Sequence, residues 1–207
     1  MPSLLAPRAD VPAADQPAPL TDADGRELLR IARVALAVAT ESRPATLLVA
    51  AVSAARRTHL GEVRAAVFVT LFEKDELRGC MGTLGPLRPL PEAVADAALL
   101  AAREDPRFWP VRAGELPAMQ LEISVLGPLV ETSDPLRLRL GVDGVVVEAD
   151  GRRALLLPQV APEQGWDARQ LWQGACHKAG LADDAWRSPG ARLSIFQVVR
   201  FDGPAQA

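Results

Sequence analysis

The segment of this chain best suited to chemistry is LRGCMG, residues 77–82, where one cysteine stands among glycines two positions after an arginine. Residues i and i+2 of an extended strand point to the same face, so the Arg78 guanidinium would lie beside the Cys80 thiol. A neighbouring cation favours the thiolate, the nucleophilic form of cysteine. Gly79 and Gly82 would let a ligand approach the backbone, whose N–H groups could bind an anion. Cys80 and Arg78 are therefore the candidate catalytic residues.

The same segment also has a purely structural interpretation. Free cysteines are among the most buried residue types, and the glycines could serve a β-bulge or a close strand–helix contact. A nucleophile also needs a positioned base, for which the chain offers only His59 and His177. His177 cannot share a helix face with Cys176, because neighbours on a helix diverge by about 100°. The sequence leaves open whether Cys80 reacts or packs.

The segment EDPRFW, residues 104–109, gathers two carboxylates and Arg107 around a proline. A general acid could be built from such groups. Turn chemistry explains the same residues, since Asp105–Pro106 would shape the exit from a helix and Arg107 would pair locally. In that interpretation Phe108–Trp109 fill the core.

The candidate binding residues come from three segments and are Gly79, Met81, Gly82, Arg107 and Gln159. Gln159 could hydrogen-bond a ligand, although most glutamines are simply exposed. We expect no metal and no cofactor, because the two cysteines and two histidines lack the spacing of zinc motifs. P-loop, dinucleotide-binding, HExxH and nucleophile-elbow patterns are also absent from the sequence.

The elements that must position these residues alternate irregularly, which predicts an α+β fold with a mixed or antiparallel sheet flanked by helices. Helical periodicity, a capping box at Thr21 and Asp24 and an N-cap at Asp167 predict helices over residues 22–41, 45–57, 89–105 and 167–178, of which the second could also pass as a buried strand. Strands are expected at residues 65–72, 77–84, 119–128, 145–148, 153–157 and 193–201. Asp150 and Gly151 would form the turn of a hairpin.

Composition excludes several classes of protein. A net charge of −3 without a basic stripe makes nucleic-acid binding unlikely as a function. Two cysteines are too few for a disulfide scaffold, and no secretory leader opens the chain. The most apolar run, residues 47–55, ends at Arg56 and is too short to span a membrane. We expect a soluble, cytoplasmic protein with free thiols and no membrane partner; the oligomeric state is not predicted.

The order of several landmarks along the chain resembles the AMMECR-one domain family, also called protein A of the AmmeMemoRadiSam system. The landmarks, in order, are FVTL, LRGCMGTL, DPRF, LEISVL, GVDGVVV, LLLPQV, GWD and KAGL followed by a tryptophan. The resemblance covers about Asp22 to Arg200. Within the LRGC-G element, Met81 stands where the family usually has isoleucine, a swap that conserves volume and polarity.

The resemblance implies a larger lobe built from both chain ends and a smaller inserted lobe. We accordingly expect a single two-lobed domain over residues 21–201, between an N-terminal tail, 1–20, and a C-terminal tail, 202–207. It also implies that the LRGC-G element is a functional surface. Relatives are associated with a MEMO-type protein and a radical-SAM enzyme, which implies a modification pathway. Whether this segment catalyses a step or docks a partner stays open.

Overall fold

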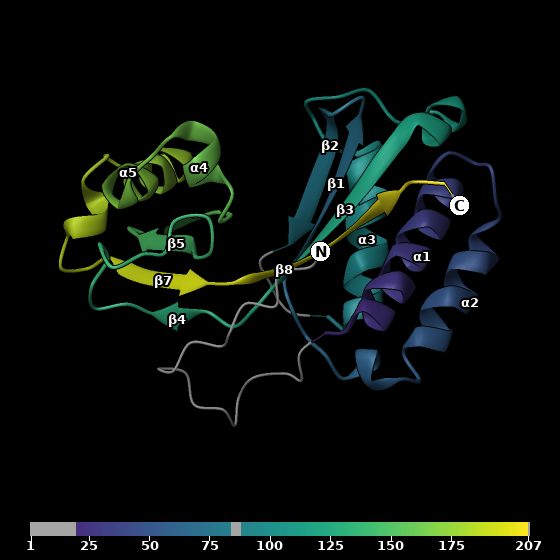
Figure 1. Ribbon diagram of the computed structural model, residues 1–207, viewed down its shortest axis with the longest axis horizontal. Coiled ribbons are helices and arrows are strands. Elements are labelled where there is room, and N and C mark those ends of the chain that lie inside the picture. Colours follow the sequence, from purple (N-terminus) through teal and green to yellow (C-terminus); the bar gives the residue numbers. More distant parts are fainter. Residues whose placement is uncertain (1–19, 84–87, 207) are drawn as a thin grey trace. The chain divides into compact units, whose positions relative to one another are not determined.

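The computed structural model describes residues 20–83 and 88–206, which divide into two compact units (Figure 1). Unit 1 contains residues 20–83, 88–125 and 199–206, and unit 2 contains residues 126–198. Each unit is an antiparallel sheet with helices, so the expected α+β fold is confirmed, with a larger lobe from both chain ends and a smaller inserted lobe. Most of the predicted N-terminal tail, and residues 84–87 of the glycine-rich stretch, lie outside the described residues.

The sheet of unit 1 places the LRGCMG segment at an edge. Its strand order is β2-β1-β3-β8, with β1 Val67–Glu73, β2 Glu76–Thr83, β3 Met119–Leu126 and β8 Val198–Pro204. Strand β1 pairs antiparallel with both β2 and β3. Alternate residues of β1, such as Val69 and Leu71, are fully buried, as expected for one face of a sheet packed on a core.

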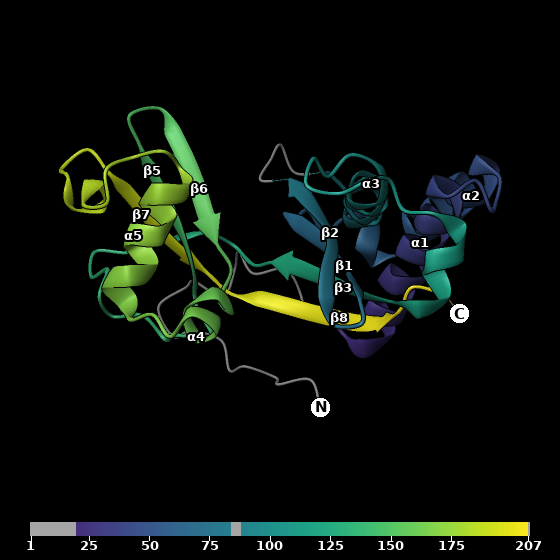
Figure 2. The same ribbon diagram turned by 90° about the horizontal axis from the view of Figure 1, so that it is seen from above.

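Helices α1 (Asp22–Ala39) and α3 (Leu90–Arg103) lie on one face of this sheet, and α2 (Ala45–Ala55) packs on their outer side (Figure 2). The unit also has the short 3₁₀ turns η2 His59–Gly61 and η3 Ala113–Ala118. The predicted capping box at Thr21 and Asp24 is present and satisfies free N–H groups of the first turn of α1. The alanine-rich face of α3 lets that helix lie close to β1 and β2. The segment 45–57 is thus a helix over most of its length and not a strand.

Unit 2 has its own sheet, helices and core. The strand order is β4-β7-β5-β6, with β4 Val130–Glu131, β5 Gly144–Ala149, β6 Arg152–Leu156 and β7 Arg192–Phe196. Helices α4 Val160–Gln164 and α5 Ala168–Lys178 and the turn η4 Ala185–Arg187 complete the unit. Asp150 and Gly151 have positive φ and join β5 to β6, as a two-residue hairpin turn requires.

The predicted last strand, residues 193–201, is wrong as a single element. Strand β7 belongs to the sheet of unit 2, and β8 belongs to the sheet of unit 1. Strand β8 also runs past the boundary expected at residue 201, and the buried Ala205 donates its N–H to the Met119 carbonyl at 2.9 Å. An apolar run alone could not show this break, because both halves have the same strand-like composition.

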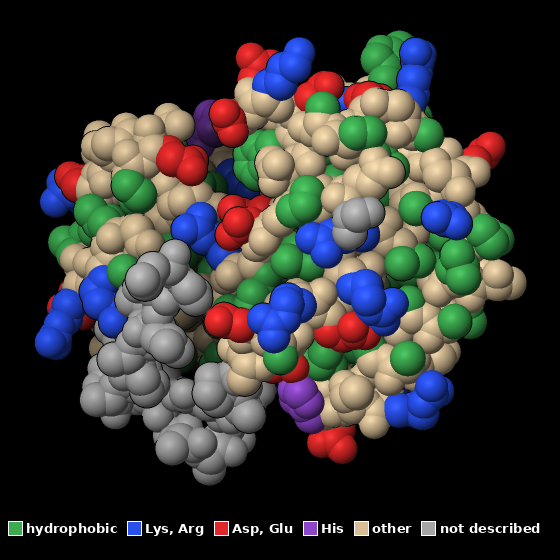
Figure 3. Space-filling model, turned by 45° about the vertical axis from the view of Figure 1, so that its right-hand side comes forward, with side chains coloured by type: hydrophobic (Ala, Val, Ile, Leu, Met, Phe, Trp, Pro, Cys, Tyr) green, Lys and Arg blue, Asp and Glu red, His purple; other side chains and the backbone are tan. Residues whose placement is uncertain are grey.

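Two surface properties bear on function. Across the face shown in Figure 3, acidic and basic side chains are intermixed over unit 1 and form no separate basic stripe. Within the described residues, none of the helices combines the length and the apolar character that crossing a membrane demands.

Candidate functional site

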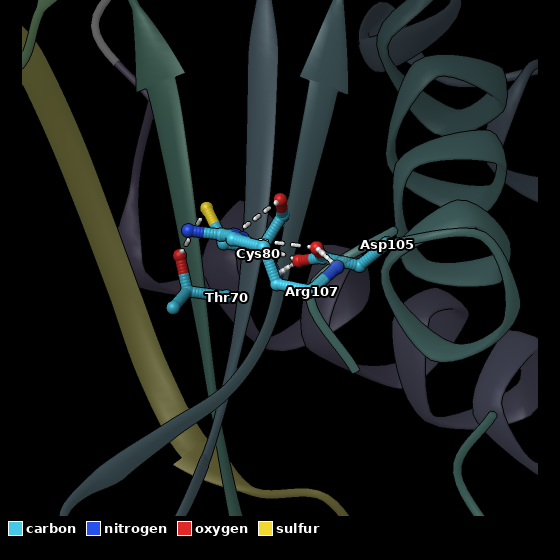
Figure 4. Close-up of polar contacts among 4 residues, drawn as sticks. All are labelled: Thr70, Cys80, Asp105 and Arg107. Atoms are coloured by element: carbon cyan, nitrogen blue, oxygen red, sulfur yellow. Dashed lines mark hydrogen bonds and ion pairs between the residues drawn. The ribbon is translucent and has the colours of Figure 1, made fainter. Parts of the chain in front are cut away.

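Cys80 lies in the edge strand β2, directly opposite Thr70 of β1. The Thr70 hydroxyl donates a hydrogen bond to the Cys80 sulfur at 3.3 Å (Figure 4). Both side chains lie on the sheet face opposite the helices, because their neighbours Leu71 and Gly79 face α3. The Cys80 side chain is half-buried, so the sulfur is held in place without being sealed in a core.

The loop after α3 binds the outer edge of β2 at Cys80. The Asp105 carboxylate accepts the Cys80 backbone N–H at 2.8 Å, and Arg107 Nη2 donates to the Cys80 carbonyl at 3.4 Å. An edge strand has a row of backbone groups without a strand partner. Asp105 and Arg107 together replace that partner at one residue. The loop therefore fixes the backbone of Cys80 as a further strand would.

Asp105 and Arg107 form a tight pair whose charges are fixed. Asp105 also accepts from Arg107 Nε at 2.9 Å, from Nη2 at 2.7 Å and from its backbone N–H at 3.1 Å. Hydrogen bonds from Arg107 hold the pKa of Asp105 well below its usual range. The hydrogen bond from the Cys80 N–H lowers this pKa further, whereas burial of the carboxylate raises it. The Asp105 hydrogen bond raises the pKa of Arg107, to which the Cys80 side chain also contributes. A permanent cation therefore lies at the Cys80 sulfur (Figure 4).

The expectation that Arg78 lies beside Cys80 is wrong. The pairing of β1 with β2 shifts by one residue, so that Leu71 is opposite Gly79 and Phe72 is opposite Leu77. Arg78 is the extra residue of this bulge, and Leu77 takes the place on the Cys80 face. The Arg78 guanidinium instead pairs with Glu115 at 2.8 Å, with only 17% of its side chain exposed. The guanidinium at the thiol comes from Arg107.

The glycines of the segment serve close packing. A Cβ added to Gly79 would lie 2.4 Å from the Ala101 carbonyl oxygen of α3, and one added to Gly82 would lie 2.2 Å from the Val67 carbonyl oxygen. Real Cβ atoms do not approach so closely, so only glycine fits at these positions. Met81 packs against the core of unit 1. The structural interpretation holds for these residues, and their binding of a ligand stays a prediction.

The EDPRFW segment matches its expected turn chemistry in part. Arg107 does pair locally with Asp105. The expectation that Phe108–Trp109 fill the core is wrong, since Phe108 is half-buried under the Arg107 guanidinium, 5.4 Å from its ring centre, and Trp109 is 87% exposed. Pro106 and Pro110 flank residues 107–109 and prevent α3 from continuing through this dipeptide.

The remaining candidates lie elsewhere. Gln159 belongs to unit 2, where it precedes α4. A hollow of about 360 Å³ on the unit 2 sheet is lined by none of the predicted site residues. Cys176 is fully buried, and burial raises the pKa of its thiol. His59 contacts Asp24 at the start of α1. Among the residues that the structure describes, no group of three or more potential metal ligands occurs.

Two members of the Cys80 site were absent from the sequence-based candidates. Thr70 lies ten residues before Cys80, and Asp105 lies 25 residues after it and had been considered as a general acid or a turn former, not as a partner of Cys80. The alternation of AAVFVTLF could have placed Thr70 on the polar face of its strand. Nothing in the sequence pairs that face with Cys80, because strand register depends on the whole sheet.

Known proteins are similar to this chain in sequence and in fold. The profile of the AMMECR1 family matches residues 29–201. The chain belongs to the AMMECR1 family. A protein of Methanothermobacter thermautotrophicus is 41% identical over 190 residues, covering 89% of this chain and 96% of that protein.

Other AMMECR1 relatives agree in sequence and in structure. Protein MK0488 of Methanopyrus kandleri is 38% identical, with 88% of this chain and 90% of that protein covered. The crystal structure of the uncharacterized protein PH0010 from Pyrococcus horikoshii is 32% identical, with a TM-score of 0.75 over 88% of this chain and 94% of that one. The AMMECR1 relationship therefore covers both units.

Proposed function

We propose that this AMMECR1 protein is an enzyme or enzyme subunit that uses the Cys80 thiolate, in a modification pathway shared with a MEMO-type protein and a radical-SAM enzyme. One observation supports the chemical part: the Cys80 sulfur receives the Thr70 hydroxyl, and the Arg107 guanidinium, bonded to the Cys80 carbonyl, lies beside the sulfur (Figure 4). Both groups are hydrogen-bond donors, and donors and cations stabilise a thiolate over a thiol.

The expected chemistry is nucleophilic. The Cys80 sulfur forms a bond to an electrophilic centre of the substrate with its own electron pair, and the displaced group leaves with the electrons of the broken bond. Arg107 would neutralise the sulfur before the attack and an anionic leaving group after it. Asp105 would act as a positioning residue, because its two bonds fix the guanidinium on the β2 edge.

Alkylation of Cys80 tests the proposal. Iodoacetamide should modify native Cys80 at neutral pH, as followed by peptide mapping, and Arg107→Gln should slow the reaction on the order of tenfold, because one adjacent cation is lost. Arg78→Gln is the matched control, since it removes a guanidinium from the same segment that pairs with Glu115 and not with the sulfur. Labelling only after unfolding, or equal slowing by both substitutions, would contradict the proposal.

A second candidate function is a non-catalytic adaptor that docks a partner through the same segment. It is favoured by the exposed apolar side chains around the edge strand, Leu77 at 40% and Trp109 at 87% exposure, because edge strands and exposed aromatic residues are common docking elements. Copurification with the MEMO-type and radical-SAM proteins separates the two functions. An adaptor loses its partner in Trp109→Ala and loses no activity in Cys80→Ser, whereas an enzyme loses turnover in Cys80→Ser.

A further inference from the structure

Three of the four buried polar side chains among the described residues of unit 1 lie at or near the Cys80 site. The described part of the chain has five buried polar or charged residues: Asp24, Thr70, Asp105, Ser124 and Asp143. Asp24 caps α1, and Asp143 binds Arg139 in unit 2. Thr70 and Ser124 lie on the sheet face opposite the helices, in one polar row, and Asp105 binds the outer edge of β2 where that row ends. Buried polar groups are costly unless they are hydrogen-bonded, and we interpret this concentration as a site that is larger than the cysteine.

The row crosses the sheet through neighbouring strands. Thr70 of β1 is opposite Cys80 on one side and opposite Glu122 of β3 on the other. Ser124 of β3 donates a long hydrogen bond to Glu122 at 3.4 Å, and Arg200 of β8 lies 3.7 Å from the same carboxylate. Cys80 and Glu122 are thus two strand spacings apart, about 9–10 Å between backbones, with only Thr70 between them.

Glu122 differs from Asp105 in how fully its oxygens are used. A carboxylate offers about four acceptor positions. Asp105 fills all of them with two backbone N–H groups and two guanidinium N–H groups at 2.7–3.1 Å. Glu122 has one long bond from Ser124 and a loose pair with the half-exposed Arg200, and 20% of its side chain is accessible. Asp105 is structurally saturated, whereas Glu122 retains acceptor capacity for a ligand.

We propose that Glu122, supported by Ser124, is a cation-binding subsite of the Cys80 site, and that the substrate carries a protonated amine or guanidinium group. This inference rests on the proposed function and specifies its substrate class. The cationic group of the substrate would lie at Glu122 of β3, and the atom attacked would lie at Cys80 of β2. Thr70 of β1 lies between these two positions. Arg107 lies at the Cys80 end of the row and would repel a second cation there. The attacked end of the substrate should therefore be neutral or anionic.

Charged thiol reagents test the subsite directly. A trimethylammonium-ethyl and a sulfonato-ethyl methanethiosulfonate are reacted separately with the native protein at low ionic strength, and peptide mapping distinguishes Cys80 from the buried Cys176. The readout is the ratio of the cationic to the anionic rate at Cys80. Glu122→Gln should lower this ratio on the order of fivefold, since an unscreened charge within about 10 Å acts oppositely on the two reagents.

Two further variants make the result specific. Arg200→Gln removes the competing cation from Glu122 and should raise the ratio, and as an exposed substitution it leaves the fold intact. Glu27→Gln is the matched control, because Glu27 is also paired with an arginine but lies on α1, on the opposite side of the sheet from Cys80. The ratio of the two rates in this variant should stay within twofold of that in the unsubstituted protein.

The outcomes separate the two proposals. If neither reagent modifies Cys80 before unfolding, the proposed function fails. If Cys80 reacts but Glu122→Gln leaves the ratio unchanged, the subsite alone fails. A change that persists undiminished in 1 M salt also overturns the subsite, because electrostatic attraction between exposed groups is screened at that ionic strength.

Discussion

Asp105→Asn tests the central physical claim, that a buried carboxylate holds Arg107 at the Cys80 sulfur. The substitution keeps the size of the side chain, and its amide oxygen can still accept the Cys80 N–H. The two bonds from the guanidinium, at 2.9 and 2.7 Å, lose their charge assistance. At about 1.5 kcal/mol each these amount to ~3 kcal/mol. Arg107 remains 53% exposed and regains water, so we expect a loss of about 2 kcal/mol in the free energy of unfolding.

The effect should depend on pH in one direction only. The pKa of Asp105 is lowered in the folded protein, with the Arg107 hydrogen bonds as the first cause. A carboxyl with a lowered pKa stabilises the fold fully above its unfolded pKa of about 3.9, and this stability is lost as pH falls through the folded pKa. Asparagine does not titrate. The difference between the two proteins should therefore be constant from pH 5 to 8 and should shrink below pH 4.

Urea titrations followed by circular dichroism measure this difference, and alkylation of Cys80 measures the displaced guanidinium. Asp143→Asn is the matched control, because Asp143 is equally buried and pairs with Arg139 in unit 2. It should destabilise its own unit and leave the reactivity of Cys80 unchanged. Equal stability of Asp105→Asn and the unsubstituted protein at pH 7 would refute the reasoning, as would a difference that does not shrink as pH falls below 4.

Three other predictions address packing, capping and burial. Gly79→Ala should destabilise unit 1 by about 1–3 kcal/mol in urea titrations, because its Cβ would meet the Ala101 carbonyl of α3; Gly114→Ala has open space and should be nearly neutral. Thr21→Ala should lower the free energy of unfolding by about 1 kcal/mol, because the N-cap of α1 is lost. If Thr21→Ala destabilises the protein less than Thr21→Gly does, Thr21 does not act as a cap. Cys176 is fully buried, so mass spectrometry should find it alkylated only in denaturant; labelling of the native protein would contradict this.

Local chemistry made much of the fold predictable. The capping box at Thr21, the Asp150–Gly151 turn and the cap of α5 at Asp167 all appear where the sequence predicts them. Such features depend on hydrogen bonds within a few residues, which the sequence alone specifies. The functional importance of the LRGCMG segment was also inferred from residue types and family resemblance, and it stays a prediction until Cys80 is tested.

The partners of Cys80 were decided by the tertiary structure. A one-residue bulge turned Arg78 away to Glu115, and the loop after α3 brought Arg107, 27 residues distant, to Cys80. Strand pairing joins Thr70 to both Cys80 and Glu122, although nothing near Thr70 in the sequence indicates either contact. Register and bulges minimise the energy of the whole sheet and its helices, so they depend on every strand at once. Sequence by itself therefore determined most of the helices and strands and the cysteine proposed as the nucleophile, while only the assembled sheet determined which charge that residue meets.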